Sequence, residues 1–463
     1  MARLAASVVA SGLVMAGAFV GAGSAVADEA PQHQGGAAAV LDGLKTYDRA
    51  VLHAGGRNQQ LPAGVFEMTV DGGGKLKTYC IDIHNPTQDR AKYLETPWDQ
   101  TSLGANKNAG KIRWILEHSY PKVDNLAALA EEAGTGPLTE KTAAAGTQVA
   151  IWRYSDNVDV EATDAAAEKL ADWLEKSAAD QAEPKASLVL DPAAVSGKSG
   201  ERLGPITVHT NAGQATVTPP VDAASGVKVT DKSGKPVTSA VNGGELYFDV
   251  PAGAADGSAS LTVQATTSVP VGRAFASATK SQTMILAGSS DSTVSATATA
   301  TWAEQGAIPA VSAEKNCAKG GVDITASNKG DEAFTFELAG KKHTVEAGKS
   351  ETVTVPVAED QAYDITVTGP EGFSKTFKGV LDCKTSSSGT GGAGGNGGHE
   401  TQTEGQPAPA TSGGGSTGSA GDLAETGGSS ATPVIAGVAI ALVVVGGGAV
   451  FLLRKRKAQP SAQ

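Results

Sequence analysis

The sequence predicts a multidomain fold, with a mixed α/β (α+β) head at residues 40–183 and two all-β, immunoglobulin-like sandwich modules at 186–309 and 311–384. Four of the five tryptophans fall in the head, where strand and helix patterns alternate. From residue 186 the chain consists of short alternating runs rich in Val, Thr, Ser and Gly, with turn residues about every ten positions, as in β-sandwiches. The 58 glycines and the aromatic content of 5% also favour several small domains over one large core.

Residues 1–27 have the pattern of a secretory signal peptide. A basic start at Arg3 is followed by an apolar run and by the small residues Ala25, Val26 and Ala27 before Asp28. This order predicts cleavage after Ala27 and export of the mature chain. A plain membrane anchor is the alternative, but small residues interrupt the apolar run.

The head shows strand patterns first and helix patterns afterwards. Alternating residues at 64–70 and 75–83 flank the Gly72-Gly73-Gly74 turn, which predicts a β-hairpin. Helical patterns follow, two of them behind the expected N-caps Asp124 and Thr163. These helices are expected at residues 109–118, 124–133, 139–154 and 164–177.

The second β module, at 311–384, begins and ends near a cysteine. Because cysteines of exported proteins normally pair, Cys317 and Cys383 are predicted to form a disulfide between the first and last strands. Closing so long a loop contributes about 4 kcal/mol in the chain-entropy model.

The C-terminal part is predicted to be a linker followed by an anchor. Residues 385–422 are Gly, Ser, Thr, Gln, Pro and Ala without apolar periodicity, as in a flexible linker. In the segment 423–463, residues 434–453 form an apolar run long enough for a transmembrane helix, and four basic residues follow. Upstream of it stand Leu423, Ala424, Glu425, Thr426 and Gly427.

This order of Leu-x-x-Thr-Gly, apolar span and basic tail resembles the sorting signal that sortases of Gram-positive bacteria recognise. The resemblance implies cleavage between Thr426 and Gly427 and attachment to peptidoglycan. Ala424 stands where proline is commoner, so the class of sortase stays open. A membrane protein held by its tail is the simpler alternative. The mature protein is therefore expected outside the cell, anchored to the cell wall after a membrane-spanning precursor stage.

Cys80 is the only cysteine in the first 316 residues, and an unpaired thiol is unusual in an exported protein. Gln148 lies on a predicted apolar helix face with Ala144, Ala145, Ile151 and Trp152, where a primary amide needs a partner. Attack of the Cys80 sulfur on the Gln148 carboxamide, with loss of ammonia, would give an internal thioester. Such a bond can acylate an amine or hydroxyl nucleophile and release the thiol.

The motifs Tyr79-Cys80-Ile81 and Thr147-Gln148-Val149-Ala150-Ile151-Trp152, in this export context, resemble the thioester domain (TQXA domain) family of Gram-positive surface adhesins. The resemblance covers residues 40–183. It implies a mixed α/β domain that forms a Cys-Gln thioester and attaches covalently to host or environmental surfaces. Cys80 and Gln148 take the reactive roles, whereas Thr147, Ala150 and Trp152 match as framework.

Other interpretations of Cys80 remain open. Cys80 and Gln148 can be an inert buried thiol and an ordinary helix glutamine, in which case the protein is a cell-wall spacer. Alternatively, Cys80 is the nucleophile of a cysteine enzyme with His84 or His118 as base. Its place inside a predicted strand, away from a helix N-terminus that would lower its pKa, argues against an enzyme.

The expected partners are an unknown surface ligand bearing an amine or hydroxyl, sortase and peptidoglycan. The formal net charge of −12 argues against nucleic acid and against anionic lipid, so the membrane is a partner only through the C-terminal helix. Seven scattered histidines and three cysteines without clustering give no transition-metal site, and no motif indicates a cofactor.

Overall fold

A computed structural model describes residues 35–220 and 226–385. These residues are mostly β, in five sheets, with four α-helices, all in the head. The mostly β architecture that the sequence predicts is thus confirmed. The predicted signal peptide at 1–27, the linker beyond residue 385 and the sorting segment at 423–463 lie outside the described residues. Within the described part, no helix is long and apolar enough to cross a membrane.

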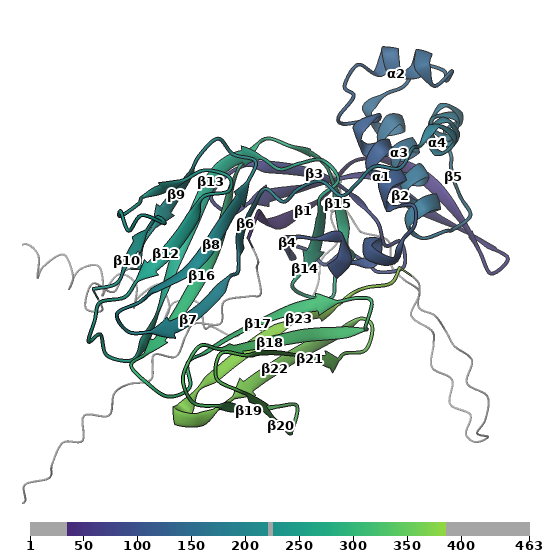
Figure 1. Cartoon of the computed structure of the whole chain (residues 1–463). Coiled ribbons are helices and arrows are strands. Elements are labelled where there is room, and N and C mark those ends of the chain that lie inside the picture. Colours follow the sequence, from purple (N-terminus) through teal and green to yellow (C-terminus); the bar gives the residue numbers. More distant parts are fainter. Residues whose placement is uncertain (1–34, 221–225, 386–463) are drawn as a thin grey trace, which may run out of the picture. The chain divides into compact units, whose positions relative to one another are not determined.

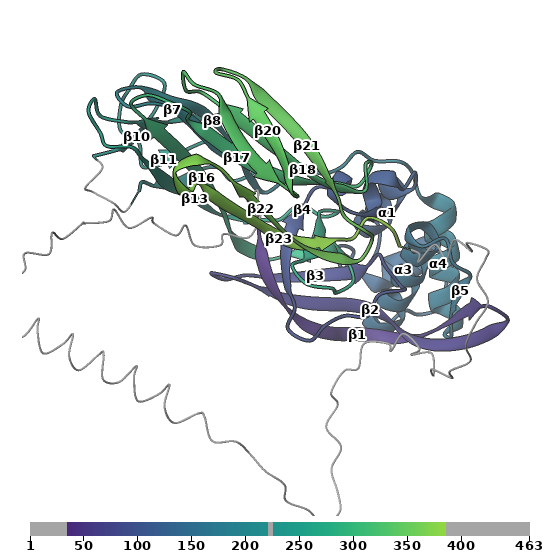
Figure 2. The same ribbon diagram turned by 90° about the horizontal axis from the view of Figure 1, so that it is seen from below.

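Six strands of the head pair in a closed ring. Each pairs antiparallel with the next in the cycle β1, β2, β3, β15, β14, β4 and back to β1 (Figure 1). The short β5 joins the ring from outside by pairing with β1 (Figure 2). The bounds are β1 Ala38–Ala54, β2 Arg57–Val70, β3 Lys75–Cys80, β4 Lys92–Thr96, β5 Val160–Ala162, β14 Ala274–Ser277 and β15 Met284–Ser289.

Two strands of this ring come from a distant part of the sequence. The sequence predicts one sandwich module over residues 186–309, whereas β14 and β15 leave that module and pair with β4 and β3 of the head. The run Met284-Ile285-Leu286-Ala287 is fully buried. A continuous apolar run of this kind suits a strand covered on both faces better than an alternating sandwich strand.

The helices lie where the sequence predicts them, with small differences at their ends. They are α1 Ala109–Glu117, α2 Leu126–Glu132, α3 Glu140–Ser155 and α4 Ala165–Ser177. The N-caps of α2 and α4 are Asn125 and Asp164, each one residue after the expected Asp124 and Thr163. Gly146 lets α3 approach α4, because an added Cβ would lie 2.4 Å from the Ala167 carbonyl oxygen.

The first sandwich module consists of two sheets. One has the order β10-β12-β8-β6 and the other β11-β9-β13-β16-β7, in which only β7 and β16 pair in parallel. Its strands are β6 Leu188–Asp191, β7 Ala194–Lys198, β8 Arg202–Thr210, β9 Ala215–Thr218, β10 Lys228–Thr230, β11 Ser239–Ala240, β12 Glu245–Asp249, β13 Gly257–Ser268 and β16 Asp291–Ala303.

The last module also has two sheets, with the orders β17-β18-β21 and β20-β19-β22-β23. The predicted disulfide between Cys317 and Cys383 is present and joins the ends of β17 and β23. The strands are β17 Pro309–Asn316, β18 Gly321–Asn328, β19 Phe334–Leu338, β20 Lys341–Val345, β21 Ser350–Pro356, β22 Gln361–Thr368 and β23 Ser374–Leu381. Short 3-10 helices occur at Trp98–Gln100, Ser102–Ala105 and Pro370–Gly372.

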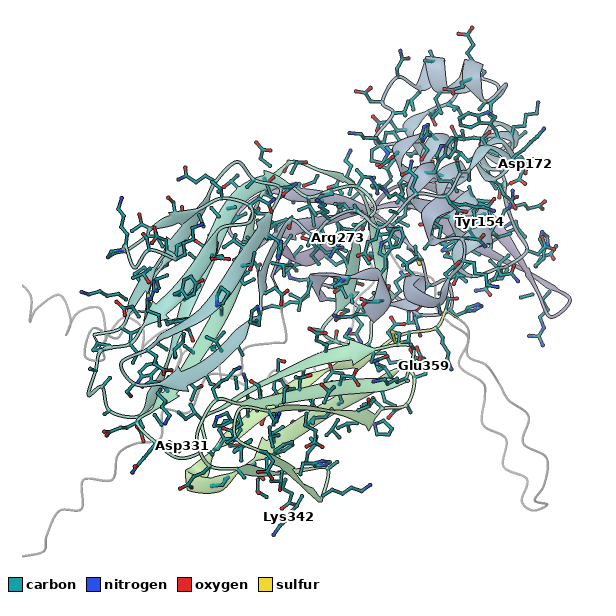
Figure 3. The ribbon with its side chains drawn as sticks, in the orientation of Figure 1. Tyr154, Asp172, Arg273, Asp331, Lys342 and Glu359 are labelled. Carbon is teal, nitrogen blue, oxygen red and sulfur yellow. A yellow bond between two sulfur atoms is a disulfide. The ribbon has the colours of Figure 1, made fainter. Side chains whose placement is uncertain are left out.

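The head and the first sandwich share one hydrophobic core, whereas the last module has a core of its own. A buried ion pair lies where head and sandwich join: Arg273, just before β14, donates to Glu95 of β4 over 2.9 Å. Their side chains are 4% and 1% exposed, and Arg273 is labelled in Figure 3. Glu95 also accepts the main-chain N–H groups of Ala37 and Ser187, so one carboxylate connects the start of the head to the start of the sandwich.

Candidate functional site

Cys80 is the last residue of β3 and is 1% exposed. Its neighbour Tyr79, fully buried, donates its hydroxyl hydrogen bond to the Tyr120 carbonyl over 2.6 Å and fixes the end of the strand. On one side of β3, Cys80 is opposite Met284 of β15 in the sheet register. On the other side, β2 pairs with β3 only as far as Thr78, which leaves the backbone of Cys80 open at that edge.

Gln148 of α3 fills that open edge. Its Oε1 accepts the main-chain N–H of Cys80 over 3.0 Å, and its Nε2 donates to the carbonyl of Cys80 over 2.8 Å. The carboxamide thus replaces a neighbouring strand, and a fully buried polar group has found its partners. Gln148 therefore positions Cys80 through its backbone, because its carbonyl accepts from the Cys80 N–H group and its amide nitrogen donates to the Cys80 carbonyl.

The side chain at the sulfur is Gln282, which the sequence analysis missed. The Cys80 thiol donates to Oε1 of Gln282, a residue two positions before β15 and 6% exposed. The backbone of Gln282 is held on both sides, because its N–H donates to the Pro86 carbonyl and its carbonyl accepts from the Tyr93 hydroxyl. A sequence signal existed in this glutamine, which stands two residues before the apolar run from Met284 to Ala287.

The three framework residues expected from the motif lie in the buried part of α3. Thr147 donates to the Ala143 carbonyl within the helix, and Ala150 is fully buried. Trp152 is 4% exposed, and its indole Nε1 has no hydrogen-bond partner among the described residues. The motif thus supplies a buried helix face against the end of β3.

Three acidic side chains surround the site. Burial, with the charge of Asp382 as the next cause, raises the pKa of Asp82 to about 8. Burial raises the pKa of Asp156 to about 7 and that of Asp382 to about 6. The pKa of the Cys80 thiol is raised well above its usual value, mainly by burial and then by the charges of Asp156 and Asp82. The resting sulfur is therefore a neutral thiol.

Glu359, Asp360 and Asp382 bring carboxylate oxygens within 4.8 Å of one another. All three groups already have donors. Glu359 accepts the main-chain N–H of Lys384 over 2.8 Å, Asp382 accepts from Thr283 over 2.7 Å, and Asp360 accepts from Asn85 over 3.3 Å. Glu359 is labelled in Figure 3. Among the described residues, this cluster is the one group of three acidic side chains whose oxygens lie close enough together to hold a metal ion.

Neither His84 nor His118, the two histidines considered as a base for a cysteine enzyme, is bonded to Cys80. His118 stacks on Trp114 with ring centroids 3.9 Å apart, and its Nδ1 pairs with the Trp114 carbonyl. Burial lowers the pKa of His84. Within the described part of the chain, neither histidine forms a hydrogen bond to Cys80. Ala27 and the five residues from Leu423 to Gly427 lie outside the described residues.

Comparisons with known proteins agree with the motifs. The sequence model of the thioester domain family matches residues 77–180, and that of the C-terminal domain of bacterial phospholipase C matches residues 309–380. No curated protein matches the chain at a significant level.

Two solved structures are similar to the chain. One is the Bacillus anthracis TIE protein, with 14% identity, coverage of 74% of this chain and 80% of that chain, and a TM-score of 0.27. The other is the thioester domain of the Enterococcus faecium TIE86 protein, with 16% identity, coverage of 58% and 97%, and a TM-score of 0.27. The family resemblance that the sequence predicts is confirmed, because the thioester domain model matches residues 77–180, which include Cys80 and α3.

Proposed function

We propose that this protein is a surface adhesin that binds its target covalently through an internal thioester between Cys80 and Gln282. The contact between the Cys80 thiol and the Gln282 carboxamide carries this proposal. The match of residues 77–180 to the thioester domain family supports it. Gln148, which the sequence analysis paired with Cys80, is assigned a positioning role, because both atoms of its carboxamide bind the Cys80 backbone.

The chemistry is an acyl transfer in two stages. In the first stage the Cys80 sulfur attacks the Gln282 carboxamide carbon, and the amide nitrogen leaves as ammonia with the thiol proton. In the second stage an amine or hydroxyl of the target attacks the thioester, the acyl group of Gln282 passes to it, and Cys80 regains its proton. Gln282 remains bound to the target, so each molecule reacts once and the protein is not an enzyme.

The termini complete the proposal. Export by the signal peptide, cleavage by sortase after Thr426 and linkage to peptidoglycan would hold the head outside the cell wall. The two β modules would then serve as a stalk, and the Cys317–Cys383 disulfide supports this by closing the module nearest the linker. The ligand is proposed only by its chemistry, as a surface molecule with an accessible amine or hydroxyl.

The mass of the intact mature protein tests the thioester. We expect the wild-type chain to be lighter by one ammonia. We also expect it to react with methylamine, which opens the thioester, frees the Cys80 thiol and leaves a methylamide on Gln282. Cys80→Ala and Gln282→Ala should both keep the full mass and take up no methylamine. A wild-type protein of full mass with a free Cys80 thiol would contradict the proposal.

The position of the methylamide distinguishes the two glutamines. Peptide mapping should find the modification at Gln282 in the wild-type protein. Gln148→Leu removes two hydrogen bonds but keeps the volume, so this variant should form less thioester while any methylamide still lies at Gln282. A methylamide at Gln148 would instead restore the pairing that the sequence analysis expected.

A further inference from the structure

Trp152 carries a buried N–H group without a partner. Its side chain is 4% exposed, and Nε1 forms no hydrogen bond within the described residues. Trp152 follows Gln148 by four residues on α3, so both side chains lie on the helix face directed to the end of β3. Since buried donors are almost always paired, this one is placed for a partner that the resting protein lacks.

The nearest candidate for that partner is the Cys80 sulfur. Burial raises the pKa of the thiol, and the indole acts weakly in the opposite direction, although its N–H does not reach hydrogen-bond geometry to the neutral sulfur. A second donor already points there, because the main-chain N–H of Asp82 lies 3.3 Å from Sγ. The turn that carries this donor is held in place, since Asn85 donates to the Asp82 carboxylate over 2.6 Å.

We propose that the Trp152 indole N–H, together with the Asp82 main-chain N–H, stabilises the negative charge that develops on the Cys80 sulfur. This inference rests on the proposed thioester chemistry. Charge develops on the sulfur twice, when it loses its proton to attack Gln282 and when it leaves as a nucleophile takes the acyl group. In the first step the proton goes to the departing ammonia, and in the second the sulfur takes the proton that the nucleophile loses.

The surroundings explain why such donors are needed. Burial and the acidic groups Asp156, at the end of α3, and Asp82, in the turn after β3, all disfavour a thiolate. A donor that gains its bond only when the sulfur is charged, as proposed for the Trp152 N–H, lowers the energy of the transition state more than that of the resting state. Trp152, expected from the sequence to be framework, is on this view a donor to the reacting sulfur as charge develops on it.

Trp152→Phe tests the inference, because it keeps an aromatic ring and removes the N–H. In the full mature chain, we expect the variant to fold and to lose ammonia, but to take up methylamine at least about tenfold more slowly than the wild type. Trp114→Phe is the matched control: Trp114 is a partly buried tryptophan of the head that stacks on His118, and its loss should leave the rate unchanged. Equal rates for Trp152→Phe and the wild type would overturn the inference.

A second measurement separates the donor from the thioester itself. In a Gln282→Ala background, Cys80 stays a thiol, and the pH dependence of its alkylation by iodoacetamide reports its ionisation. Adding Trp152→Phe should shift half-maximal reactivity to higher pH, whereas adding Trp114→Phe should not. An unchanged profile overturns the role of Trp152 even if methylamine uptake has slowed. If the wild-type chain never loses ammonia, the proposed function is wrong. The alkylation experiment still tests the role of Trp152 in that case, because it needs only the free Cys80 thiol.

Discussion

Two buried glutamines lie beside Cys80, and their surroundings give them different roles. Gln148 has its carbonyl on a backbone N–H and its amide nitrogen on a backbone carbonyl, so its polar groups are satisfied as they stand. Gln282 has its carbonyl at the thiol. A buried carboxamide is stable where both its oxygen and its nitrogen have hydrogen-bond partners. It can react where a nucleophile such as a thiol lies beside it.

The acidic side chains at the site predict how stability depends on pH. The pKa of Asp82 is raised from 3.8 to about 8 and that of Asp156 to about 7, mainly by burial. Between the unfolded and folded pKa values, the native state holds protons that the unfolded chain has released. The free energy of unfolding contributed by these groups is therefore fully present at low pH and falls as pH rises through this window.

Asp82→Asn should remove part of this dependence. We expect the variant to raise Tm more at about pH 8 than at about pH 5, since the cost to the wild type of keeping Asp82 protonated begins near the unfolded pKa of 3.8 and grows as the pH rises to the folded pKa of about 8. Thermal unfolding at both pH values measures the difference. Asp71→Asn, at an exposed aspartate of the same domain, is the control and should shift Tm equally at both. The same equal shift for Asp82→Asn would contradict the interpretation.

At the scale of elements, the β14–β15 hairpin is what the sequence did not reveal. The strand with Cys80, the four helices and the framework face of α3 could be predicted, because each depends on local periodicity and on caps. Gln282 lies 202 residues from Cys80, between β13 and β16, which pair with each other along their whole length in the sandwich. Local patterns describe such a hairpin as one more sandwich strand, and only long-range pairing places it in the head.

Arg273 is predicted to hold this hairpin in the ring. Arg273→Met keeps most of the side-chain volume but leaves the Glu95 carboxylate buried without its charged partner, so we expect a loss of about 3–5 kcal/mol in the free energy of unfolding. Urea denaturation measures it. Arg57→Met, at an exposed arginine of β2, should cost little.

A double variant sharpens this test. Adding Glu95→Gln to Arg273→Met removes the unpaired charge, so the pair should be less destabilised than the sum of the two single changes. Strict additivity would show that the ion pair does not connect these segments energetically.

At the scale of the whole molecule, the two separate cores predict separate unfolding. The head and the first sandwich share one core and should unfold together, whereas the last module has its own core and its disulfide. Replacing Cys317 and Cys383 together by alanine should lower the free energy of unfolding of the last module by about 4 kcal/mol. One calorimetric transition should then move to lower temperature, and the other should stay unchanged. Ammonia loss at Cys80 should also be unaffected. A single transition that shifts as a whole would contradict two independent cores.

The origin of Gln282 in an inserted hairpin has a mechanical consequence. A bond between Cys80 and Gln282 ties β3 to the start of β15 and closes a loop with a sequence separation of 202 residues, worth about 5 kcal/mol in the chain-entropy model. In the proposed reaction, capture of a ligand would open that loop and leave the ligand attached to Gln282. Tension from the ligand would then enter at β15, whose neighbours on both sides, β3 and β14, belong to a closed ring, so the load would be shared by a structure without a free edge at that strand.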